Sequence, residues 1–250
     1  MIRIEPEADG IVEIVLDRPD KRNALLPEML TELVRAADRL TGSARCVVVR
    51  GEGRVFCAGF DLHACHEAED SSVMRDLLTG LANATAAWRA AAVPVVAAVH
   101  GAAIAGGCAL LGIADTVIAA PGTRFGYPVL AIGVSPAVSA PFLASAVGHG
   151  PARERLLNID LIDAAEAERR GLIHRIVDDP AAAARETARL LASRPRHGLA
   201  ATKAWLGEID GVGDARPASL AASLGLVGGP EETALLAAWA RASRDRARPS

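Results

Sequence analysis

Aromatic residues are scarce in this chain of 250 residues, making up 3% of it although 51% of its residues are hydrophobic. The apolar mass is therefore mainly Ala, Val and Leu, which suits closely packed helices and buried strands. Neither sign of charge dominates, because 27 Lys and Arg stand against 30 Asp and Glu, for a net charge of −3. Without a basic field to hold a phosphate backbone, we expect no nucleic-acid partner.

Cysteine is also rare, and its four copies form no C-x-x-C pair. In a chain of this size, that pattern predicts reduced thiols and a cytoplasmic protein without a disulfide framework. The densest group of candidate metal ligands is Cys57, His63, Cys65 and His66. It lacks the ligand spacing of a zinc site at both ends, so we expect no metal.

Long uninterrupted hydrophobic runs are missing as well. The apolar stretch 90–114 is broken by Pro94, His100 and several glycines. These interruptions predict a strand, a turn and a helix in place of a membrane span. The first residues lack the basic and then apolar pattern of a secretory signal, so we expect no membrane partner.

Short apolar runs alternate with helical patterns over the first two-thirds of the chain. Strands that are apolar on both faces and alternate with helices are typical of a parallel sheet, which predicts an α/β core. From Ser135 onward the pattern is mainly helical, interrupted by a Gly- and Pro-containing stretch, 211–230, that is expected to be a linker. The predicted strands are 11–16, 46–50, 95–99 and 116–120, and the predicted helices are 26–40, 73–92, 106–114, 163–170, 181–192, 198–206 and 231–242.

Two glycine-bearing turns end apolar runs, and they carry the chemistry of interest. In 57–61 (Cys-Ala-Gly-Phe-Asp), small residues let the backbone approach a ligand closely. In 103–108, a glycine pair opens a predicted helix whose first N–H groups have no partner in the helix. Two such N–H groups aimed at one point would stabilise a negatively charged oxygen. For each turn alone, an ordinary connection between a strand and a helix is the alternative. Neither of the phosphate-binding motifs G-x-x-x-x-G-K-[ST] and G-x-G-x-x-G occurs in the chain.

Taken together and in order, these segments resemble the enoyl-CoA hydratase/isomerase (crotonase) superfamily over nearly the whole chain. Three segments resemble its coenzyme A loop and its two oxyanion loops, and three more match later landmarks. These segments are 16–25, 55–62, 98–108, 124–128, 163–173 and 200–203.

The resemblance implies a spiral α/β core of ββα units over residues 1–190, with a C-terminal helical trimerisation region over residues 191–250. It also implies a homotrimer or a dimer of trimers. The substrate would be an acyl-CoA thioester of fatty acid metabolism, handled by lyase or isomerase chemistry. Coenzyme A would be part of that substrate, and no cofactor would be tightly bound.

Carried over position by position, the resemblance places the oxyanion N–H donors at Phe60 and Gly106. Lys21 and Arg22 would face the phosphates of the coenzyme, where paired cations suit phosphate oxygens. A solvated turn is the alternative for these two side chains. The remaining contacts to the coenzyme would come, mostly through backbone groups, from Ala24, Ala58, Asp61 and Leu62.

The chain departs from the pattern at both proton-transfer positions. The two glutamates that hydratases of this family use correspond to Ala109 and Val129, neither of which can transfer a proton. Because such groups contribute on the order of a hundred- to ten-thousand-fold, efficient hydration by the usual mechanism is not expected. His63 or Tyr127 could supply a proton, although a surface role for His63 and a packing role for Tyr127 are open alternatives.

Three functions therefore stay open. The first is a hydratase- or isomerase-like protein that stabilises a thioester enolate. The second is a decarboxylase of a malonyl-type thioester, since loss of CO2 needs no general base. The third is a catalytically inactive paralogue that binds acyl-CoA, because a fold alone does not establish a function.

Overall fold

The fold is built around a six-stranded sheet with the strand order β1-β2-β3-β4-β6-β8, in a computed structural model that describes residues 1–6, 8–40, 42–68 and 70–247. β1 pairs antiparallel with β2, and the other four pairs are parallel. The parallel core predicted from the apolar runs is thus confirmed. The strands are β1 (Ile2–Pro6), β2 (Ile11–Leu16), β3 (Cys46–Gly51), β4 (Val95–Val99), β6 (Thr116–Ala119) and β8 (Arg175–Ile176).

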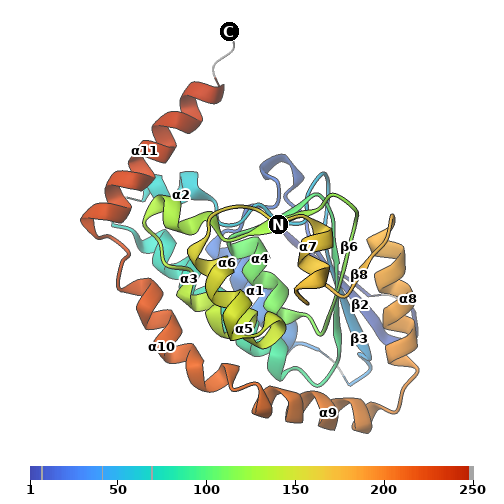
Figure 1. The fold of residues 1–250 in the computed structure, drawn as a ribbon. Helices are drawn as coiled ribbons and strands as arrows, with labels where there is room; N and C mark the ends of the chain where they lie inside the picture. Colours follow the sequence, from blue (N-terminus) through green and yellow to red (C-terminus); the bar gives the residue numbers. More distant parts are fainter. Residues whose placement is uncertain (7, 41, 69, 248–250) are drawn as a thin grey trace.

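Helices cover both faces of this sheet, as Figure 1 shows. α8 packs on one face, where Val48 and Val96 meet Ala184 and Ala188 in a small core. α1 and α3 pack against each other over the main core on the other face. The helices are α1 (Pro27–Asp38), α2 (Leu62–Glu67), α3 (Ser72–Ala90), α4 (Gly106–Ala109), α5 (Ala140–Val147), α6 (His149–Leu157), α7 (Ala164–Arg169), α8 (Pro180–Ala192), α9 (Arg196–Ile209), α10 (Val212–Leu224) and α11 (Pro230–Ala247).

A second, two-stranded parallel sheet carries the glycine-bearing turns. It consists of β5 (Ala102–Ile104) and β7 (Arg124–Gly126). Neither strand was predicted, because three residues are too few to show an alternating pattern. Five 3₁₀ helices complete the described elements: η1 (Ala8–Gly10), η2 (Pro19–Lys21), η3 (Leu110–Ile113), η4 (Pro128–Ile132) and η5 (Pro136–Ser139).

Two predicted elements differ from the structure. The single helix expected over 106–114 is the one-turn helix α4 followed by η3. The stretch 211–230, expected as a linker, contains the 13-residue helix α10. Buried Ser223 on α10 donates a 2.9 Å hydrogen bond to the carbonyl of Ser135 and accepts one of 2.9 Å from the amide of Val138. The sequence of this segment, which contains Pro217, favours a helix only weakly, and the contacts with η5 stabilise the helix.

The helices that follow α8 wrap around the main core, and α11 ends away from it (Figure 1). Within the described part of the chain, no helix is both long and apolar enough to cross a membrane. The division at residue 190 stays a prediction, and positions 7, 41, 69 and 248–250 of the two predicted regions lie outside the described residues.

Candidate functional site

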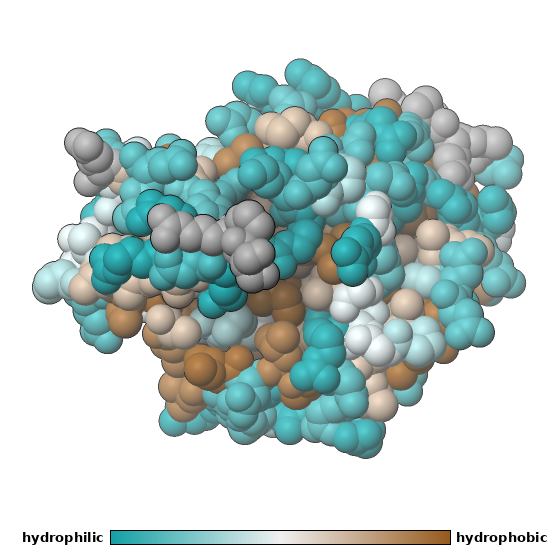
Figure 2. Space-filling view, turned by 90° about the horizontal axis from the view of Figure 1, so that it is seen from above, coloured by the Kyte–Doolittle hydropathy of each residue, from teal (hydrophilic) through white to brown (hydrophobic). Residues whose placement is uncertain are grey.

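A cavity of about 610 Å³ opens beside the two glycine-bearing turns. Its wall comes from the loop after β2, from the segments 58–63 and 104–106, from α3, from η4 and η5, and from α11. Figure 2 looks down on this end of the molecule and shows apolar surface between hydrophilic side chains. The two turns that the sequence singles out therefore share one cavity.

The turn 57–61 is held in place from both sides by backbone hydrogen bonds. On one side, Cys57 N–H donates to Ala102 O (3.1 Å) and Ile104 N–H donates to Cys57 O (3.0 Å). On the other side, Leu25 N–H donates to Gly59 O (2.7 Å), and the amide following Phe60 donates to Leu25 O (2.9 Å). The amide of Phe60 lies between these pairs, and among the described residues no protein group accepts from it.

The amide of Gly106 has no protein acceptor among the described residues either. It follows Ala105, whose φ of 51° is unusual for a residue with a side chain and indicates local strain. A Cβ added to Gly106 would lie 2.6 Å from Cε1 of the Phe60 ring. A Cβ on Gly59 would lie 2.8 Å from the carbonyl oxygen of Ile104 and 3.6 Å from Gly106 N. Glycine at both positions therefore permits the close approach of two cavity-lining segments that carry unpaired amides.

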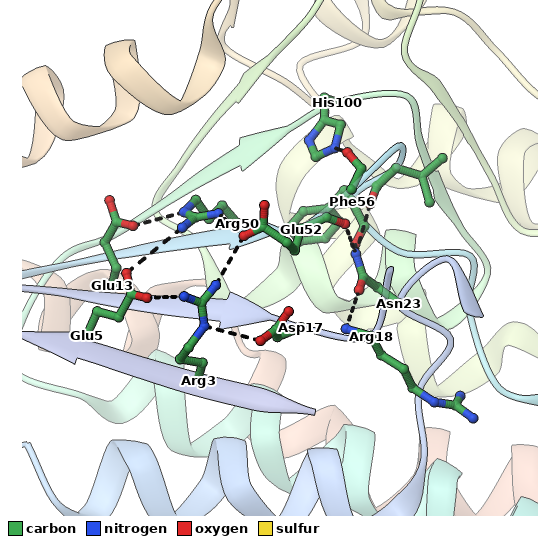
Figure 3. Close-up of polar contacts among 12 residues, drawn as sticks. Arg3, Glu5, Glu13, Asp17, Arg18, Asn23, Arg50, Glu52, Phe56 and His100 are labelled. Carbon is green, nitrogen blue, oxygen red and sulfur yellow. Dashed lines mark hydrogen bonds and ion pairs between the residues drawn. The ribbon is translucent and has the colours of Figure 1, made fainter. Parts of the chain in front are cut away.

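Asn23 ties the loop after β2 to the segment that leads into the first turn (Figure 3). It is fully buried and adopts a φ of 54°, a left-handed conformation that asparagine tolerates better than most residues. Its amide nitrogen donates to the carbonyls of Glu52 (2.8 Å), Val55 (3.0 Å) and Phe56 (3.1 Å), while its oxygen accepts from Arg18 N–H (2.8 Å). The sequence predictions placed Asn23 in the segment 16–25 but gave it no individual role.

Asp61 caps α2 and faces Arg18. Its Oδ1 accepts from the amides of His63 (3.2 Å) and Ala64 (3.3 Å), and its Oδ2 lies 2.7 Å from Arg18 Nη1. Burial by itself raises the pKa of Asp61, but the Arg18 bond and the helix amides together bring it below its ordinary value. The carboxylate lines the cavity with its charge already paired.

The residues expected to contact the coenzyme all line the cavity. Lys21 and Arg22 are exposed on the rim, beside Asp20, which was not expected there. The other four predicted contacts, which line the same cavity, are Ala24, Ala58, Asp61 and Leu62. Among the described residues, no group of three or more His, Cys, Asp and Glu side chains could hold a metal ion.

The candidate proton donors are both at the cavity, in different surroundings. His63 is exposed on α2, and its Nε2 lies 3.4 Å from Ser243 Oγ. Tyr127 is buried, and burial together with the neighbouring thiol of Cys108 raises its pKa well above the ordinary value. The phenol is therefore a neutral hydrogen-bond donor over the physiological pH range.

The two positions predicted to correspond to the family's glutamates have different surroundings. Val129 lines the cavity on η4. Ala109 is 4% exposed on α4 and is not among the described residues of the cavity wall. Of the two, Val129 has the more direct access to a bound ligand.

Parts of the wall come from residues that the sequence predictions left out. Met74, Leu78 and Leu81 present an apolar face from α3, and Trp239 and Ser243 come from α11. The helical spacing of Trp239 and Ser243 marks one face of α11, but spacing does not show which surface that face meets.

Comparison with known proteins identifies the family of this chain. The enoyl-CoA hydratase/isomerase family model matches residues 6–222. A Mycobacterium tuberculosis protein with the name "Probable enoyl-CoA hydratase EchA14" is 37% identical over 196 residues, covering 77% of this chain and 76% of the relative.

Solved structures share the fold over almost the full length. An enoyl-CoA hydratase/isomerase from Xanthobacter autotrophicus Py2 superposes with a TM-score of 0.86 at 30% identity, covering 100% of this chain and 98% of that one. A second, from Mycobacterium paratuberculosis, gives 0.87 at 25% identity, with 95% and 97% covered. These likenesses confirm the predicted crotonase-type α/β fold. The chain belongs to the enoyl-CoA hydratase/isomerase family.

Proposed function

We propose that this protein binds an acyl-CoA thioester in the cavity and polarises its carbonyl oxygen with the N–H groups of Phe60 and Gly106. The observation that carries the proposal is that these two unpaired amides border one cavity. Backbone donors held in a protein wall stabilise an oxyanion strongly, because they need no reorganisation when charge develops. Negative charge on the thioester oxygen would accompany an enolate.

The charges around the cavity support an orientation for the substrate. Lys21 and Arg22 on the rim suit the phosphates of coenzyme A. The wall formed by the described residues of α3, η4 and η5 contains no Lys or Arg and is mainly apolar. The coenzyme would therefore lie along the rim, with the acyl group directed inward.

An apolar wall favours an uncharged acyl group. The free carboxylate of a malonyl-type thioester would be buried there without a cation, which is costly. This observation supports an enoyl- or acyl-type substrate over the decarboxylase alternative. We propose no tightly bound cofactor, since coenzyme A arrives as part of the substrate.

The reaction would be of the hydratase/isomerase type, with a slow proton transfer. Ala109 and Val129 leave the two usual glutamate positions without a carboxylate. The proton-transfer groups that border the cavity are then His63 and Tyr127. A protein that binds acyl-CoA but turns nothing over would correspond to the inactive paralogue. A homotrimer or dimer of trimers stays a prediction.

Calorimetric titration with crotonyl-CoA and with free coenzyme A tests the proposal. We expect the thioester to bind the wild type. In Gly106→Ala, the new Cβ collides with the Phe60 ring, so affinity for the thioester should fall by about tenfold or more while free coenzyme A is affected less. Gly198→Ala is the matched control, because no atom lies within 4 Å of a Cβ at that position in α9.

Three results would contradict the proposal. If no acyl-CoA released or absorbed heat on titration, acyl-CoA thioesters would not be the ligands of this protein. Equal binding of thioester and free coenzyme A would show that the acyl carbonyl is not recognised. Tight binding of malonyl-CoA, at least equal to that of crotonyl-CoA, would contradict the inferred uncharged acyl group.

A further inference from the structure

The last helix, α11, forms part of the cavity wall although the family model ends at residue 222. Its inward face is formed by residues at helical spacing. Leu236 is 6% exposed and Ala240 is 1% exposed, while Trp239 is half-buried against the core and borders the cavity. Ser243, one turn further on, also lines the cavity. A segment outside the matched region therefore contributes to the ligand site.

The beginning of α11 is anchored on η4. Gly133, at the end of η4, has a φ of 71°, and a Cβ there would lie 2.8 Å from Cα of Glu232. Glu232 is buried, and its Oε2 accepts from Gly228 N–H at 3.2 Å. Because η4 also carries Val129 and Ile132 of the cavity wall, this contact fixes α11 relative to the site.

The second half of α11 rests on α2. The ring of Trp239 packs against that of His63 with centroids 4.9 Å apart and planes inclined by 57°. Ser243 Oγ lies 3.4 Å from His63 Nε2. Since α2 begins directly after the Phe60 turn, Trp239 is held near the proposed carbonyl site as well as near the apolar wall.

We propose that Trp239 sets the length and bulk of the acyl chain that the cavity accepts. Its indole is large and rigid and borders the same cavity as Met74, Leu78 and Leu81 of α3, so it limits the space available to an acyl tail. The inference rests on the proposed binding of acyl-CoA and adds to it a residue that determines chain-length specificity.

Binding of butyryl-, octanoyl- and dodecanoyl-CoA to Trp239→Ala tests the inference. Truncation opens space, so the preference for dodecanoyl- over butyryl-CoA should rise by about tenfold or more relative to the wild type, as expected for added room in an apolar pocket. Trp205→Ala is the control, since Trp205 is 66% exposed on α9 and is not among the cavity-lining residues described. It should change the same ratio by less than about twofold, as exposed substitutions usually do.

The outcomes separate this inference from the proposed function. If Trp239→Ala weakens all chain lengths equally, Trp239 only supports the structure and the inference is wrong. If the wild type binds none of the three thioesters, the proposed function fails instead. Circular dichroism and thermal melting show whether each variant is folded.

Fluorescence gives a second test that needs no truncation at Trp239. The chain has three tryptophans, and Trp88 is fully buried on α3. In Trp205→Phe, saturating dodecanoyl-CoA should shift the emission to shorter wavelength, because an acyl chain would shield the half-exposed Trp239 from water. Free coenzyme A should not cause the shift, and neither should dodecanoyl-CoA with the double variant Trp205→Phe/Trp239→Phe. Unchanged emission in Trp205→Phe at saturation would overturn the inference.

Discussion

Arg18 and Asp61 form an ion pair in which Arg18 Nη1 lies 2.7 Å from Asp61 Oδ2, and this pair joins the loop after β2 to the beginning of α2. The same guanidinium nitrogen donates to the carbonyl of Ala24 at 3.0 Å. Both segments border the cavity, so the pair couples the proposed coenzyme rim to the proposed oxyanion turn.

Replacement of Asp61 by Asn should lower the free energy of unfolding at neutral pH by about 1–3 kcal/mol, because it removes a charge-assisted hydrogen bond and the negative charge at the N-terminus of α2. The pKa of Asp61 is lowered in the folded state, so its ionised form stabilises the fold. That contribution is complete above the ordinary pKa of 3.8 and is lost as the pH falls through the lower folded value.

Urea unfolding between pH 3 and pH 7 measures this effect, with the exposed Asp76→Asn on α3 as control. The difference between the wild type and Asp61→Asn should shrink toward the acid end. A difference that is constant across this range, or that grows as the pH falls, would show that the charge of Asp61 does not stabilise the fold.

Asn23 offers a comparison between hydrogen bonding and backbone conformation. Asn23→Gly removes the side-chain bonds but keeps a residue suited to a φ of 54°, whereas Asn23→Ala removes the bonds and adds strain. We expect a loss of about 2–4 kcal/mol in unfolding free energy for Gly, and about 1 kcal/mol more for Ala. Thermal and urea unfolding of the pair measure both contributions. Equal stabilities would mean that the left-handed conformation costs nothing.

Hydration of crotonyl-CoA should be slow in the wild type and faster with carboxylates restored. Val129→Glu places a carboxyl group on the cavity wall, while Ala109→Glu must first make room at a site that is 4% exposed. We therefore expect the double variant to hydrate crotonyl-CoA about a hundredfold faster or more. Val129→Glu alone should disturb the fold less than Ala109→Glu alone. Loss of absorbance of the conjugated thioester measures the rate, and Val129→Gln is the uncharged control. Rapid turnover by the wild type would show that another group replaces the glutamates.

Tyr127 is the only tyrosine of the chain, so its ionisation can be followed directly. Burial and the neighbouring Cys108 raise its pKa, and the folded protein should show no tyrosinate absorbance at 295 nm near the ordinary pKa of 10. The unfolded chain should titrate there. Because the protonated phenol is favoured in the fold, its contribution to stability is complete below pH 10 and is lost as the pH rises further. Tyr127→Phe serves as the blank for the absorbance measurement. If tyrosinate appeared in the folded protein near pH 10, Tyr127 would be accessible to water.

Most of the central elements follow from local pattern. The apolar runs that become β3 and β4, and the helical spacing in α1 and α3, are strong enough to predict each element. Secondary structure is missed where contacts with distant segments stabilise an element that its own sequence favours only weakly. α10 contains Gly213 and Pro217 and directly follows Gly211, yet it is held against η5 through Ser223. The strands β5 and β7 are too short to be recognised, and they form through pairing with each other and with the segments at Cys57 and Ile162.

The candidate site also has features that the sequence predicts and features that only the tertiary structure shows. Six segments in order along the chain, the two glycine-bearing turns among them, predicted the family by resemblance, and that resemblance implied Phe60 and Gly106 as candidate donors. Contacts between distant segments had no such signal. Trp239 meets His63 across 176 positions in the sequence, and the contact exists because α11 buries its apolar face where η4 and α2 leave room for it. Periodicity shows that a helix has a face to bury, whereas the shape of the packed core determines which surface receives it.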